Sequence, residues 1–172
     1  MGRLSTTVCT ILAALLLQIM FGSAFAVAGV TPNIVMVAVI LIAFVRGSTE
    51  GTIVGFIAGL ALDFLGAVIV GPMALTLTIT GFVAGIIREQ VFAGGWLLPM
   101  TVLGFASLAS ETVYLLLLIA LGTPIGFFSS FFGTVLPSTL YAVVIAVIVF
   151  KPVTKFLRGA MTSDPDTVKR AK

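Results

Sequence analysis

The sequence predicts an all-α integral membrane protein, folded as a single bundle of six transmembrane helices. Three observations support this: 60% of the 172 residues are hydrophobic, only 9% are charged, and the mean hydropathy is +1.29. Soluble domains carry about a quarter charged residues, so the composition excludes that class. The length fits one compact bundle rather than two domains.

Six apolar blocks follow one another along the chain, and we interpret each as one membrane span. A spanning helix needs about 20 apolar residues, and the second block is short by this measure. The third and fourth blocks form one long apolar run, which we expect to bend near Gly66 to Pro72. The predicted spans are residues 4–28, 30–46, 51–67, 71–88, 97–121 and 126–150.

Three prolines are expected to shape these spans. Pro32 and Pro72 are interpreted as turn residues beside the second and fourth spans. Pro137 lies inside the sixth span, where it should kink the helix and free the carbonyl group of Gly133. The hydroxyl groups near enough to satisfy this carbonyl belong to Thr134, Ser138 and Thr139.

With six spans, all nine basic residues fall on the same side of the membrane. Arg3 precedes the first span, Arg46 follows the second and Arg88 follows the fourth. The others follow the sixth span, beginning with Lys151 and Lys155, and the three opposite loops carry no charge. The positive-inside rule therefore places both termini in the cytoplasm. We expect residues 151–158 on the membrane surface and residues 159–172 to form a short disordered tail.

The composition also argues against enzyme chemistry. The chain has no histidine and one cysteine, Cys9, so His-dependent acid–base catalysis, His/Cys metal sites and disulfides are excluded or nearly so. We expect no catalytic residues, metal or cofactor. The pI near 9.4 is interpreted as membrane topology and contact with anionic lipid, rather than as nucleic-acid binding.

The first apolar block also resembles a secretory signal peptide, because it ends in Ala24-Phe25-Ala26. Its apolar stretch is long for a signal peptide, so we expect it to be retained as the first span.

Small residues four positions apart predict close helix packing. Gly51, Gly55 and Gly59 form one row on the third span, and Gly81 and Gly85 form another on the fourth. Helices associate in lipid by close packing, and small residues let two backbones approach. The rows predict either packing inside this bundle or a groove that docks a partner helix, and one helix can do both on different faces.

Three polar side chains lie within the predicted spans. Asp63 continues the glycine row, about 18 Å along the helix from Gly51, where a carboxylate is costly unless it is paired, neutral or hydrated. We interpret it as a cap for the following turn or helix, with an ion or proton site or a partner contact as alternatives. Glu111 and Gln18 are expected to form a polar network between the fifth and first spans. A proton relay is less favoured, because the two acids are expected at different depths.

The order of these motifs resembles the MreD family of rod shape-determining proteins. The resemblance begins at Gln18 and continues through TPNIVMVAVILIAFVRGSTEG, GFIAGLALDFLG and GPMALTLTITGFVAG, roughly residues 15–88. LPSTLY in the C-terminal half matches less specifically. The chain departs from the pattern at Asn33, where many members have an acidic residue, and at Ala142, where Asn is frequent. No polar role is carried over to those two positions.

The resemblance implies a non-enzymatic protein of the bacterial cytoplasmic membrane that takes part in lateral peptidoglycan synthesis. The implied partners are MreC first, and then MreB, RodA and a penicillin-binding transpeptidase. The implied fold is similar to the substrate-binding subunit of energy-coupling-factor vitamin transporters. For docking MreC we single out Gly51, Gly55, Gly59 and Asp63, with Gln18 and Pro32 supporting the local fold.

Two other functions remain open from the sequence. One is a small-molecule carrier, either a vitamin-type transporter subunit or a lipid-handling protein. Ala24 and Ala28 resemble the small-residue pair that such subunits use for docking, but they fall at the outer end of the first span, and the outer loops are short. The other is ion or proton passage through Asp63 and Glu111.

Overall fold

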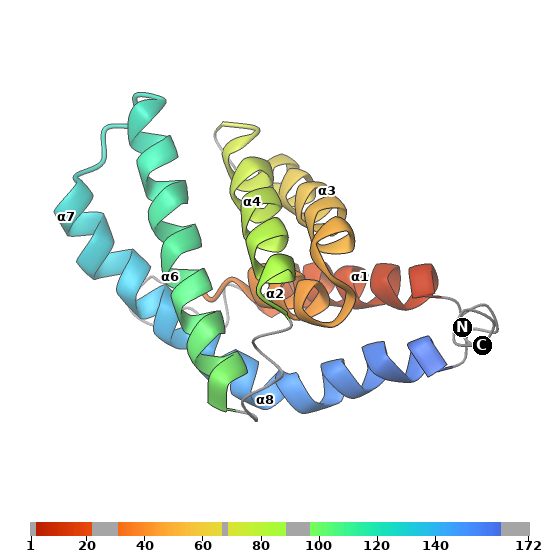
Figure 1. Cartoon of the computed structure of the whole chain (residues 1–172). Coiled ribbons are helices and arrows are strands. Elements are labelled where there is room, and N and C mark those ends of the chain that lie inside the picture. The colour runs from red at the N-terminus through yellow and green to blue at the C-terminus, as the bar shows by residue number, and fades with distance from the viewer. Residues whose placement is uncertain (1–2, 22–30, 67–68, 89–96, 163–172) are drawn as a thin grey trace.

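The computed structural model describes residues 3–21, 31–66, 69–88 and 97–162, and these residues contain helices but no β-strand (Figure 1). The all-α class is therefore confirmed. The helices are α1 (Arg3–Phe21), α2 (Ile34–Arg46), α3 (Ser48–Gly66), α4 (Pro72–Ile86), α6 (Leu97–Ala120), α7 (Phe127–Ser130), the π-helical turn η1 (Phe131–Val135) and α8 (Leu136–Thr162).

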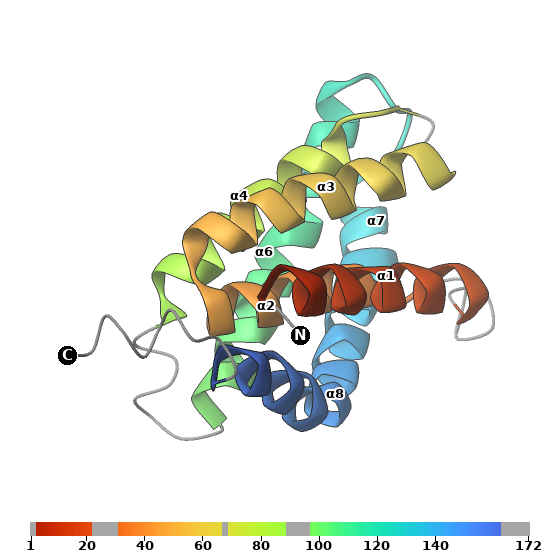
Figure 2. The same cartoon turned by 90° about the vertical axis from the view of Figure 1, so that its right-hand side faces the viewer.

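The helices surround α2. In Figures 1 and 2, α3 and α4 form an antiparallel hairpin beside α6, while α1 and the C-terminal part of α8 run across these helices. Helix α2 contacts α1, α3, α4, α6 and α8, and every residue from Val35 to Arg46 is buried. A helix that is apolar on all sides is expected at such a central position.

Helix α2 begins at Ile34, whereas the predicted span began at residue 30. Pro32 has no N–H to donate, and Asn33 acts as the N-cap: its Oδ1 accepts the Met36 N–H at 3.0 Å. The helix is therefore only about 20 Å long, shorter than the roughly 30 Å hydrocarbon core of a bilayer. Its N-terminus consequently lies inside the bundle.

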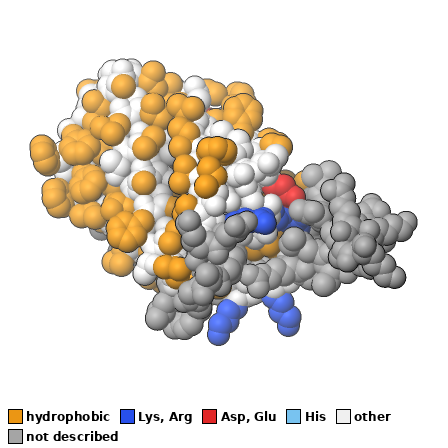
Figure 3. Space-filling model, in the orientation of Figure 1, with side chains coloured by type: hydrophobic (Ala, Val, Ile, Leu, Met, Phe, Trp, Pro, Cys, Tyr) orange, Lys and Arg blue, Asp and Glu red, His pale blue; other side chains and the backbone are white. Residues whose placement is uncertain are grey.

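The surface of the described residues is that of a membrane protein. Three helical stretches are long and apolar enough to cross a bilayer, namely Ser48–Gly66, Leu98–Ala120 and Phe127–Leu157, and three apolar helices are shorter. Large apolar side chains point outward: Phe105 and Phe128 are each 75% exposed. Figure 3 shows such side chains spread over much of the visible face. Lipid tails solvate a surface of this kind, whereas water does not.

The region around Pro137 differs in detail from the prediction. A π-helical turn precedes the proline, and the Leu136 N–H donates to the Phe131 carbonyl five residues earlier. Such turns are a known way to accommodate an irregularity in a helix. The nearby hydroxyls satisfy groups other than the Gly133 carbonyl: Ser138 donates to Glu111, and Thr139 donates to the Val135 carbonyl.

Helix α8 extends to Thr162, beyond the predicted end of the sixth span at residue 150. Pro152 lies inside it, and Leu157 is fully buried. The packing of Leu157 supports the helix beyond residue 150. Residues 159–162 therefore belong to α8 rather than to a disordered tail. Residues 163–172, and Ala24 to Ala28, lie outside the described residues.

Candidate functional site

The glycine row of α3 lies against the backbone of α4. A Cβ atom on Gly51 would lie 2.5 Å from the Gly81 carbonyl oxygen. On Gly59 it would lie 2.6 Å from the Ala74 Cα, and on Gly55 it would overlap the Leu77 carbonyl. All three glycines are buried. Only glycine permits this approach, so the row is occupied by a contact inside the chain.

The glycines of α4 complete the same contact from the other side. A Cβ atom on Gly81 would overlap the Gly51 carbonyl, and one on Gly85 would overlap the backbone of Ser48. The five predicted glycines therefore form one antiparallel helix–helix interface. The sequence left open whether these glycines pack inside the bundle or dock a partner helix. The geometry places them in packing inside the bundle.

Asp63 fixes the turn between these two helices. Its Oδ2 accepts the N–H groups of Gly71 and Ala74, each at 2.9 Å, and its Oδ1 accepts that of Met73 at 3.2 Å. The residue is 1% exposed. It thus caps the N-terminus of α4 from the end of α3, where the helix dipole also favours a negative charge.

Asp63 also borders a polar cavity of about 310 Å³ at the N-terminal ends of α2 and α4. Both helices begin here, so non-helical backbone is placed where it lines a cavity rather than lipid. The polar side chains that line it are Gln18, Thr31, Asn33, Asp63, Glu111, Tyr114, Thr134 and Ser138.

The cavity brings together two acidic residues that lie far apart in the sequence. Glu111 and Asp63 line the same space, although they were expected at different depths. Glu111 accepts a hydrogen bond from Ser138 at 3.2 Å. Gln18 does not bond Glu111 as expected; its Oε1 accepts the Ile34 N–H at 2.7 Å and so helps to cap α2. Gln18 and Glu111 therefore line the same cavity instead of forming the predicted hydrogen-bond network between the first and fifth spans.

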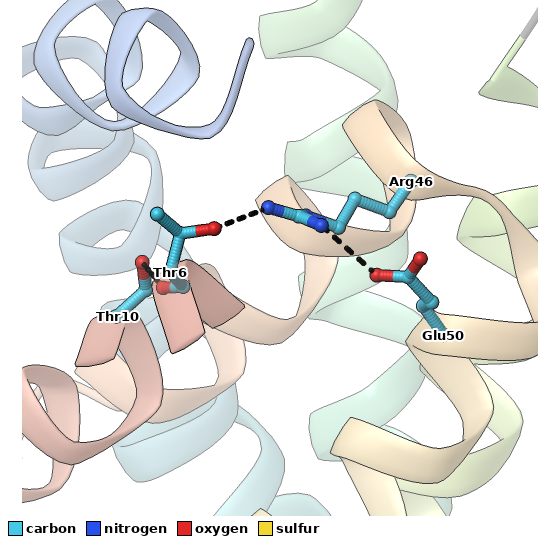
Figure 4. A network of polar contacts seen from close by, with 4 residues as sticks. All are labelled: Thr6, Thr10, Arg46 and Glu50. Carbon is cyan, nitrogen blue, oxygen red and sulfur yellow. Dashed lines mark hydrogen bonds and ion pairs between the residues drawn. The ribbon is translucent and has the colours of Figure 1, made fainter. Parts of the chain in front are cut away.

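A second polar cluster lies at the opposite end of α2 (Figure 4). The Arg46 side chain is completely buried and forms an ion pair with Glu50 at 3.4 Å. Its Nη2 donates to the Thr6 hydroxyl at 2.6 Å, and Thr10 donates to the Thr6 carbonyl. Arg46, which the sequence identified only as a topology marker, thus connects α1, α2 and α3.

Arg88 lies at this same end of the bundle. A Cβ atom on Gly47 would lie 3.0 Å from Arg88 Nη1, and Gly47 has a φ of +97°. Glycine is favoured at such a backbone angle. The Arg88 side chain therefore packs against Gly47 in the α2–α3 connection, whereas Lys151 and Lys155 are exposed on α8.

A small groove of about 100 Å³ runs between α4 and α6. Each helix contributes residues at spacings of three and four, which place them on one face. The Thr80 and Ser110 hydroxyls bond each other at 2.5 Å on its floor, and Ala109 is exposed. The lining residues are Thr76, Ile79, Thr80 and Val83 from α4, and Ala106, Ala109, Ser110 and Val113 from α6.

Among the described residues, no group of three or more His, Cys, Asp or Glu side chains could hold a metal ion. Sequence reasoning gave no role to Asn33 or Thr6. Asn33 has the signal of an N-cap, since it directly precedes an apolar helical run. The contact between Thr6 and Arg46 joins residues 40 positions apart and has no local signal.

These features define a helical membrane protein with a glycine-packed hairpin and a polar cavity. The chain belongs to the MreD family: the family described as rod shape-determining protein MreD matches residues 1–160. Membership assigns it a role in determining rod shape. No curated protein and no solved structure matches the chain.

Proposed function

We propose that this protein is a non-catalytic scaffold of the cell-elongation complex, which binds MreC and supports lateral peptidoglycan synthesis. MreB, RodA and a penicillin-binding transpeptidase form the wider assembly. The observation that carries the proposal is the family match over residues 1–160. The described residues are consistent with it, since they form one helical bundle with apolar faces directed outward.

The scaffold crosses the cytoplasmic membrane six times, with both termini in the cytoplasm. The meeting of Arg46, Thr6 and Glu50 at one end of the bundle supports this topology, because basic residues are concentrated on the cytoplasmic side. In a Cys9→Ser background, an impermeant maleimide should label Pro124→Cys in spheroplasts and Lys155→Cys only after permeabilisation. Labelling of both positions from the outside would contradict the sixth crossing.

The α4–α6 groove is the surface that we assign to MreC. The α3–α4 glycine interface is already occupied, so a partner helix must bind elsewhere. The groove offers two rows of residues at helical spacing and small side chains such as Ala106 and Ala109. Small residues let a partner helix approach closely within lipid, and an amphipathic or apolar helix lies naturally in such a groove.

Filling the groove tests this assignment. Ala109→Phe places an aromatic ring on the exposed rim and should reduce co-purification of MreC at least about tenfold, as expected for the loss of a central contact. Ala120→Phe is the matched control, because Ala120 is also an exposed alanine of α6. Cells that depend on the Ala109→Phe protein should lose their rod shape. Equal MreC recovery for both variants would exclude the α4–α6 groove.

The polar cavity favours a second candidate function, a membrane carrier of a small polar molecule. A cavity of about 310 Å³ lined by Gln18, Glu111 and Tyr114 has the size of a small-ligand site. Native mass spectrometry of the purified protein should then show a bound molecule that Glu111→Leu releases. Spectra without any small-molecule adduct would remove this candidate. The expected likeness to vitamin-transporter subunits stays a prediction.

A further inference from the structure

A larger groove, of about 270 Å³, lies between α1, α2 and α8. Exposed Cys9 and Ala13 of α1 form one side, buried Ala38 of α2 forms the floor, and Pro152 and Phe156 of α8 form the other side. The lining is almost entirely apolar. Its Thr10 hydroxyl is already used, since it donates to the Thr6 carbonyl at 2.8 Å. The groove therefore suits a hydrocarbon occupant.

The dimensions of the groove fit a single acyl chain better than a helix. Its α1 side runs from Cys9 to Leu17, about 12 Å of helix. A partner helix is about 10 Å wide with its side chains, so it would rest on the rim of the groove. The lining below would then lose its dispersion contacts. A lipid tail is thin and flexible enough to fill the space.

Helix α8 places two cations beside this apolar groove. Lys151 and Lys155 are exposed and lie one turn apart, and Lys155 follows Pro152 by three residues, so the two lysines border the α8 side of the groove. In Figure 3, basic side chains project from the lower edge of the molecule, away from its apolar surface. An amphipathic helix in the membrane interface has this arrangement, with its cations at the level of the headgroups.

We infer that the groove binds an anionic phospholipid of the inner leaflet. One acyl chain lies between α1 and α8, and the phosphate lies at the level of Lys151 and Lys155. Basic residues near the cytoplasmic surface attract anionic headgroups, which gives the site its lipid preference. This inference goes beyond the scaffold function and does not depend on MreC.

Native mass spectrometry of the full-length protein tests the site. The protein is incubated in detergent with phosphatidylglycerol or phosphatidylcholine of identical acyl chains, and the retained lipid is counted. We expect phosphatidylglycerol to be retained preferentially. Replacing both lysines, as Lys151→Gln with Lys155→Gln, should reduce this preference by about fivefold for each lysine. Both positions are exposed, so folding should be unaffected.

A second variant separates the groove from the headgroup site. Ala13→Phe fills the groove and should abolish retention of both lipids, whereas Ala120→Phe should retain lipid like the wild type. Equal retention of the two lipids by the wild type would overturn the proposal, as would unchanged retention by Ala13→Phe. Displacement of the lipid by MreC, with Cys9 crosslinked to the MreC helix, would likewise assign the groove to a protein partner.

Discussion

At Asp63, three backbone donors offset the cost of a carboxylate inside a membrane. The N–H groups of Gly71, Met73 and Ala74 all point to it. Each would otherwise be an unsatisfied donor at a helix N-terminus in an apolar medium. The acidic residue at the end of the glycine row is therefore explained by the helix that follows it, without requiring an ion.

Replacing Asp63 should therefore affect stability before function. Asp63→Ala removes all three acceptor contacts and should destabilise the protein by about 2 kcal/mol, the upper range for an N-cap. Asp63→Asn keeps one acceptor oxygen and should lose less. Thermal unfolding in detergent measures both. If Asp63→Ala unfolds at the wild-type temperature, the cap contributes nothing and the residue must be explained differently.

Gly55 provides the second test at this scale. A Cβ atom at this position would overlap the Leu77 carbonyl, and backbone cannot move aside as a flexible side chain can. Gly55→Ala should therefore separate α3 from α4 and destabilise the protein by about 2 kcal/mol.

Gly66→Ala is the control for Gly55→Ala, because a Cβ atom there would meet nothing within 4 Å. Its unfolding free energy should stay within about 0.5 kcal/mol of the wild type. Equal stabilities for the two variants would show that the close α3–α4 contact is not maintained in the protein.

The sequence predicted the role of a residue where that role depends on residues close to it in the chain. Spacing alone placed Gly51, Gly55 and Gly59 on one face, and the turn after Asp63 suggested a cap. It did not indicate that Gln18 would bond the start of α2, because the contact joins residues 16 positions apart. The choice between Ile34 and Glu111 as its partner depends on how α1 crosses α2, which no short-range pattern encodes.

Among the elements, α2 shows how a short helix can form the centre of a membrane bundle. Asn33 and Gln18 cap its N-terminus, and Arg46 connects its C-terminal end to α1 and α3. The sequence predicted the apolar character of this segment but extended it to residue 30. Helix α8 continues to Thr162, past residue 150 where the sixth span was predicted to end, and Leu157 in this continuation is fully buried.

The contribution of the Arg46 contacts to stability can be tested separately from the contribution of its charge. Arg46→Lys keeps the positive charge on which the proposed topology depends, but a lysine cannot reproduce the planar fork that contacts Thr6 and Glu50 together. We expect a loss of about 2 kcal/mol in detergent, as for a hydrogen bond to a charged group, with unchanged orientation in labelling experiments. Lys155→Gln, at an exposed position, is the control. Wild-type stability of Arg46→Lys would make Arg46 a topology marker only.

For the whole molecule, the fold class and family followed from composition and motif order, whereas the surfaces did not. The polar cavity, the α4–α6 groove and the α1–α2–α8 groove each combine residues from at least two helices. Their partners in space depend on helix crossings that hydropathy does not report. As a result, the glycines favoured for docking lie inside the bundle, and the proposed MreC surface is a different face.

Site-specific photo-crosslinking in living cells tests the scaffold account most directly. A photoreactive amino acid at position 109 lies in the α4–α6 groove, and one at position 120 lies on the same helix outside it. The account predicts a strong crosslink to MreC from position 109 and a weak or absent one from position 120. Failure to capture MreC from position 109, with the protein present at normal levels, would contradict the assignment.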